Sequence, residues 1–100
     1  MDPKPSSTIL LVRDNPYGGN IEVLLMQRRH SMSFGGAYAF PGGKLEKEDC
    51  SPNLFQCSNG PNDQVASRTL KVAHGGLSYF IASIRECYEE TGILLATNCL

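Results

Sequence analysis

The chain has 100 residues, nine of them Lys or Arg and ten Asp or Glu, which gives a formal net charge of -1. A chain of this length forms one domain at most, and its near-neutral charge provides no electrostatic footprint for nucleic acid or an anionic membrane surface. Hydrophobic residues make up 41% and charged residues 19%, as in an ordinary globular protein. Its apolar runs are far shorter than the roughly 20 residues of a membrane span. With a polar start, we expect an intracellular protein with reduced cysteines and no nucleic-acid or membrane partner.

Short strands are predicted in the first part of the chain. The segments at 7–13 and 21–27 are apolar and of strand length, and the turn-forming residues at 14–20 predict a hairpin with a longer loop. A third short strand is predicted at 37–40. It should stop at the Pro-Gly-Gly of 41–43, where ladder pairing cannot easily continue.

The second part of the chain contains the strongest helix signal. Turn-forming residues from about 44 to 76 predict an excursion with a single helical turn near 64–70. A helix is predicted at 78–91, with Ser78 as its N-cap and Gly92 as its left-handed C-terminal cap. Another strand should begin directly after it, with the Ile-Leu-Leu that follows Gly92.

Three carboxylates gather on one side of this predicted helix. Glu86 and Glu90 are one turn apart, and Glu89 lies between them, opposite the apolar side. Like charges at this spacing destabilise an isolated helix by a few tenths of a kcal/mol per pair. The face is therefore either solvated, which is the commoner case for such residues, or holds a cation. Carboxylate oxygens are the ligands that Mg2+ and Mn2+ prefer.

Two motifs favour the cation. Phe-Pro-Gly-Gly at 40–43 ends a predicted strand with residues that let the backbone approach a ligand closely. Residues 85–93 read R-E-C-Y-E-E-T-G-I, which matches R-E-U-x-E-E-x-G-U, where U is a bulky aliphatic residue. The sequence thereby resembles the Nudix hydrolases, whose box is G-x5-E-x7-R-E-U-x-E-E-x-G-U. Gly43 fits the opening glycine, Asp49 stands where the family has glutamate, and 35 residues separate Asp49 from Arg85 instead of seven.

An insertion inside the box, with F-P-G-G ahead of it, is similar to the coenzyme A diphosphatase-like branch of this family. The resemblance implies an α+β fold, an α/β/α sandwich with a mixed sheet. Residues 1–100 would form the N-terminal part of that single domain, incomplete at the C-terminus, with an inserted loop at about 47–76. A peroxisomal or mitochondrial location is also implied by the branch, and a cytoplasmic one otherwise.

The implied activity is hydrolysis of a diphosphate linkage with Mg2+ or Mn2+ as cofactor. The substrate would be a small nucleoside-diphosphate derivative, first of all coenzyme A or an acyl-coenzyme A. Nucleotide sugars and dinucleotides remain alternative substrates, and a truncated fragment that only binds metal or a partner remains an alternative of another class. The oligomeric state is left open.

The resemblance also implies roles for individual residues. Arg85 is expected to orient the box carboxylates, and Gly42 and Gly43 to bend the chain around the metal. Upstream, Arg28 and Arg29 would bind phosphate oxygens, although a solvated strand end explains them equally well. Coenzyme A-directed members of the family carry a segment with spaced arginines upstream of F-P-G-G, and Met32 stands where its second arginine is expected. The resemblance does not identify the general base. The expected catalytic residues are Arg85, Glu86, Glu89 and Glu90; the metal ligands are Asp49, Glu86, Glu89 and Glu90; the substrate-binding residues are Arg28, Arg29, Gly42 and Gly43. His30 and His74 lie in polar, loop-like segments and are expected to take no part in catalysis.

Overall fold

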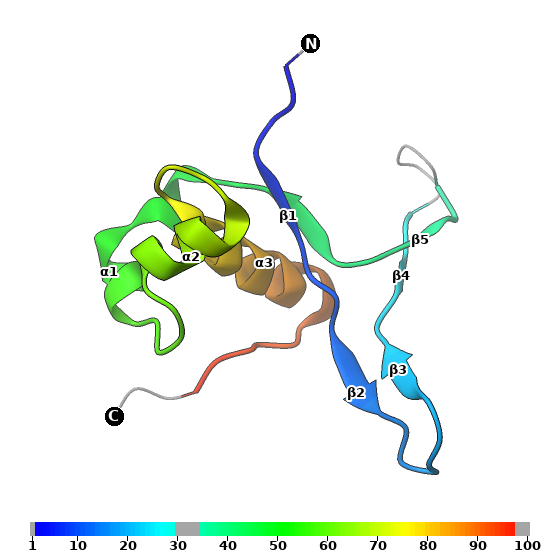
Figure 1. Cartoon of the computed structure of the whole chain (residues 1–100). Coiled ribbons are helices and arrows are strands. Elements are labelled where there is room, and N and C mark those ends of the chain that lie inside the picture. The colour runs from blue at the N-terminus through cyan, green and yellow to red at the C-terminus, as the bar shows by residue number, and fades with distance from the viewer. Residues whose placement is uncertain (1, 30–34, 98–100) are drawn as a thin grey trace.

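The computed structural model describes residues 2–29 and 35–97. The chain combines helices with small antiparallel sheets, which confirms the predicted α+β class. In Figure 1 the helices gather on one side of the molecule, and two pairs of strands project from the other side. His30 and Met32 lie outside the described residues.

The strands form three separate two-stranded antiparallel ladders. β1 (Ser6–Thr8) pairs with β6 (Gly42–Lys44), β2 (Val12–Asp14) with β3 (Ile21–Val23), and β4 (Met26–Gln27) with β5 (Tyr38–Ala39). The predicted hairpin is confirmed in β2 and β3. Each of its predicted strands is divided in two, however, because the halves pair with different partners. Within the described residues the ladders do not join into one mixed sheet.

The predicted third strand is confirmed in β5, which ends before the Pro-Gly-Gly segment, but the expectation that pairing cannot continue there is wrong. β6 begins at Gly42 and pairs with β1 through Thr8, Ser7 and Ser6. A Cβ atom on Gly42 would lie 2.4 Å from the carbonyl oxygen of Ser7. The absence of a side chain therefore allows the close approach of the two strands, and glycine here promotes pairing instead of ending it.

The segment predicted as an inserted loop contains three short helices. These are the 3₁₀-helix η1 (Lys47–Cys50), α1 (Pro52–Gln56) and α2 (Asp63–Leu70). A reciprocal cap between Glu46 and Asp49 starts η1, and the Asn62 side chain caps α2 by accepting the N–H of Val65 at 2.9 Å. The single helical turn predicted near 64–70 is thus a helix of eight residues.

The long helix α3 (Gly76–Thr91) begins two residues before its predicted start. Ser78 is not its N-cap, because side chains of α2 accept hydrogen bonds from the first N–H groups of α3. The Asp63 carboxylate accepts from Gly75 at 3.1 Å and from Leu77 at 3.0 Å. At the other end the predicted cap is confirmed, since Gly92 is left-handed with φ 77°. The prediction of a strand directly after Gly92 is wrong, because the described residues that follow it have no regular secondary structure.

The small core is built from residues of α2 and α3, which pack against each other. Its buried apolar side chains in the described part of the chain are Ala66, Leu77, Ala82 and Cys87. A Cβ atom on Gly76 would lie 2.4 Å from the backbone nitrogen of Ser67, so glycine permits this close contact between the two helices. None of the described helices is long and apolar enough to cross a membrane.

Candidate functional site

Arg85 lies at the centre of a hydrogen-bonded cluster that joins three elements. Its Nε donates to Oδ1 of Asp49 at 2.9 Å, and its Nη2 donates to Oδ2 of Asp49 at 3.0 Å. Its Nη1 donates to Glu86 at 3.0 Å and to Glu89 at 3.1 Å. Nη2 also donates to the carbonyl oxygen of Lys44 at 3.0 Å. One guanidinium group therefore connects η1, β6 and the acidic side of α3, and it has the carboxylate partners predicted for it.

The pair formed by Asp49 and Arg85 is shielded from water. The Asp49 side chain is 1% exposed and that of Arg85 19%. Burial acts to raise the pKa of Asp49, but the hydrogen bonds from Arg85 and from the N–H of Glu46 outweigh it and hold that pKa below its ordinary value. The hydrogen bonds to Asp49, and further to the box glutamates, raise the pKa of Arg85. Both groups are therefore ionised at neutral pH.

Asp49, one of the expected metal ligands, has both carboxylate oxygens engaged by donors of the protein. Both of its oxygens accept hydrogen bonds from Arg85, and Oδ2 also accepts the backbone N–H of Glu46 at 2.8 Å. Its contacts are those of a residue that positions the guanidinium group.

The glycines of β6 face the carboxylates of α3. A Cβ atom on Gly43 would lie 2.5 Å from the carboxyl carbon of Glu86, so the carboxylate rests on this glycine. Next to it, the N–H of Gly42 donates to Oε2 of Glu90 at 3.1 Å. Together these two contacts place Glu86 and Glu90 against the Gly-Gly segment.

A cavity of about 500 Å3 opens beside these contacts, lined by parts of β4, β5 and the end of α3. Arg28 and Arg29 line it together with Glu89 and Glu90, so both expected phosphate-binding arginines and two of the four expected metal ligands share one cavity. Phe40 is a further lining residue, which the sequence analysis did not include among the candidate site residues. Its membership of the F-P-G-G motif was the signal for a role at the site.

The donor chemistry of α3 fits a hard divalent cation. The hydrogen bonds described engage one oxygen each of Glu86, Glu89 and Glu90. Among residues 2–29 and 35–97, however, no three His, Cys, Asp or Glu side chains gather closely enough to hold a metal ion. Glu89 and Glu90 are exposed, so their side chains can rotate toward a common point at small cost.

The remaining candidates lie away from this cluster. His74 is exposed and lines another cavity beside α2. Cys50 and Cys57 are exposed free thiols, whereas Cys87 is a buried free thiol of α3.

Comparisons with protein-family models, curated proteins and solved structures find no match to this chain. A proposal for its function therefore depends on the motifs and on the geometry described above.

Proposed function

We propose that this chain is part of a Nudix hydrolase domain, an α/β/α sandwich, that hydrolyses a diphosphate linkage in a nucleoside-diphosphate derivative with Mg2+ or Mn2+. The observation that carries the proposal is the meeting of two halves of a motif that are far apart in the sequence. Gly43 and Asp49 contact Glu86 and Arg85, although 35 residues separate Asp49 from Arg85. Seven residues span this interval in the family pattern, and here the helices α1 and α2 lie within it.

The residues of the cluster have distinct roles in this proposal. Glu86, Glu89 and Glu90 would hold the cation, which when bound withdraws charge from phosphate oxygens and lowers the pKa of a water molecule. Arg85 restrains two of these carboxylates, and Asp49 fixes the guanidinium group in its plane. Since the guanidinium is held on several sides, it offers Glu86 and Glu89 a hydrogen-bond donor at a fixed place.

The lining of the 500 Å3 cavity also includes groups that would recognise the substrate. Arg28 and Arg29 carry positive charge toward the phosphate oxygens, which guanidinium groups bind with two parallel hydrogen bonds. Phe40 offers an apolar surface, 38% exposed, within the same cavity. Basic and aromatic groups together favour a phosphorylated nucleoside such as coenzyme A as the substrate.

Hydrolysis by the purified chain tests the proposal. Product formation is measured with Mg2+ on coenzyme A, on 3′-dephospho-coenzyme A and on a nucleotide sugar. We expect Mg2+-dependent turnover that falls at least about 100-fold in Glu90→Gln. The matched control is Glu48→Gln, which alters an exposed glutamate of η1 that does not line the 500 Å3 cavity.

Substrate preference is part of the same experiment. We expect Arg29→Ala to reduce the preference for coenzyme A over its 3′-dephospho form. Absence of turnover on all three compounds by folded protein, or equal turnover in wild type and Glu90→Gln, contradicts the proposal.

A further inference from the structure

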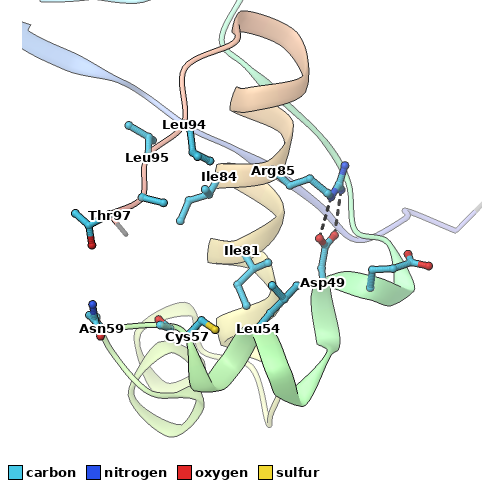
Figure 2. Close-up of a pocket in the computed structure, with 14 residues that line it drawn as sticks. Asp49, Leu54, Cys57, Asn59, Ile81, Ile84, Arg85, Leu94, Leu95 and Thr97 are labelled. Carbon is cyan, nitrogen blue, oxygen red and sulfur yellow. Dashed lines mark hydrogen bonds and ion pairs between the residues drawn. The ribbon is translucent and has the colours of Figure 1, made fainter. Parts of the chain in front are cut away.

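A second and larger cavity shares Arg85 and Asp49 with the cluster described above. It has a volume of about 670 Å3 and is lined by η1, by α1 with the loop that follows it, by α3, and by residues 94–97. Figure 2 shows Ile81 and Ile84 projecting from α3, with Leu54 from α1 beside Ile81 and Leu94 opposite Ile84. None of the box glutamates 86, 89 and 90 lines it.

We propose that this cavity binds the alkyl chain of a small, electrically neutral ligand. Its volume lies within the roughly 300–1,000 Å3 of typical ligand pockets. The side chains in its middle are aliphatic, and no aromatic side chain contributes to its lining in the described residues. Water is a poor occupant of such a space, because ordered water needs several polar partners. Flexible methylene chains fill an aliphatic surface well, whereas flat rings find no stacking partner here.

The charges of the lining decide what the polar end of the ligand can be. Arg85 and Asp49 neutralise one another through two hydrogen bonds. Glu48 also lines the cavity, so the lining has a net negative charge. A carboxylate or phosphate head group is therefore repelled. At the end away from Arg85, Asn59 and Thr97 offer uncharged hydrogen-bonding groups, which suit a hydroxyl or amide (Figure 2).

Two thiols of the chain provide an internal control for a binding experiment. Cys57 lines the cavity and is exposed to reagents. Cys50 is also exposed but does not line it. The rate of alkylation by iodoacetamide is measured at each cysteine by mass spectrometry of its peptide, with and without added 1-decanol. We expect saturating 1-decanol to slow alkylation of Cys57 at least fivefold and to leave Cys50 unchanged.

The alkyl-chain length and the head group of the added ligand provide two further tests. Each methylene that is buried raises the affinity about fourfold, so 1-decanol should protect Cys57 at a concentration about 15 times lower than 1-octanol does. Decanoate, with the same chain and a negative charge, should protect it more weakly than 1-decanol. Ile84→Phe fills part of the cavity and should weaken protection, whereas Val65→Phe, on the exposed side of α2, should not.

Three results would overturn the inference. The first is no protection of Cys57 in the wild-type chain. The second is equal protection of Cys57 and Cys50, which indicates adsorption to the surface. The third is a Cys57 rate that falls with protein concentration in the absence of ligand, which indicates that a second copy covers the cavity. All three results are measured on the wild-type chain without an activity assay, so this inference can fail or succeed independently of the proposed hydrolase function.

Discussion

The substitution Asp49→Asn tests whether one buried ion pair joins the inserted helices to α3. The amide keeps the shape of the side chain but removes its charge, and its NH2 group then faces the Arg85 guanidinium. Removing one partner of a buried pair costs about 3–5 kcal/mol. Arg85 is 19% exposed and keeps its bonds to Glu86 and Glu89, which places the expected loss near the lower end, at about 3 kcal/mol.

Urea unfolding followed by circular dichroism measures this loss as a change in the free energy of unfolding. The matched control is Glu22→Gln, which breaks the ion pair between Arg13 and Glu22 on the surface, where the two side chains are 78% and 42% exposed. That pair is expected to contribute no more than about 1 kcal/mol. If Asp49→Asn costs as little as Glu22→Gln, the reasoning about the buried pair is refuted.

The difference in free energy of unfolding between wild type and Asp49→Asn should depend on pH in a defined direction. The pKa of Asp49 in the folded chain lies below its ordinary value of 3.8, so its contribution is fully present above that value. As the pH falls through the folded-state pKa, the carboxylate is protonated and the contribution is lost. The gap between wild type and Asp49→Asn should therefore be constant from neutral pH down to about 5 and shrink below about 4. A gap that widens on acidification contradicts this assignment.

Two glycine substitutions test the close contacts of α3. Gly43→Ala pushes on the Glu86 carboxylate, the far end of a flexible side chain, so we expect little loss of stability but a fall in Mg2+-dependent hydrolysis of about 100-fold. Unchanged hydrolysis would argue against the proposed position of Glu86. In Gly76→Ala the added methyl group collides with the backbone of Ser67, which is less able to move than a flexible side chain. We therefore expect the free energy of unfolding in urea to fall by about 2–3 kcal/mol. The control Gly60→Ala has open space around it and should change stability by less than about 0.5 kcal/mol, and equal effects of the two changes would contradict the described packing.

Local sequence signals predicted the features that depend on local physics. The turn residues at 14–20 specified the hairpin, because they fix the reversal of the chain between two apolar segments. Gly92 specified the end of α3, since a left-handed cap needs a residue without a Cβ atom. The grouping of Glu86, Glu89 and Glu90 followed from the helical period alone.

The features that sequence reasoning missed depend on partners far along the chain. α3 starts at Gly76 because Asp63 accepts its first N–H groups, and this contact between helices has no signature near Ser78. β6 forms because β1 approaches Gly42 closely, which the local preference of Pro-Gly-Gly for turns does not reveal. The place of Asp49 beside Arg85 likewise depends on how the inserted helices fold, and the spacing of 35 residues could not specify it.

Binding of Mn2+ tests the central claim, that the carboxylates of α3 converge on a divalent cation. The measurement is a titration of the folded chain followed by electron paramagnetic resonance, in which free and bound Mn2+ are distinguished. It compares three proteins: wild type, a double variant that carries both Glu86→Gln and Glu90→Gln, and the control Glu22→Gln. We predict saturable binding by wild type and by Glu22→Gln, and loss of that binding in the double variant. Equal binding by all three proteins, or none by the folded wild-type chain, would contradict the account.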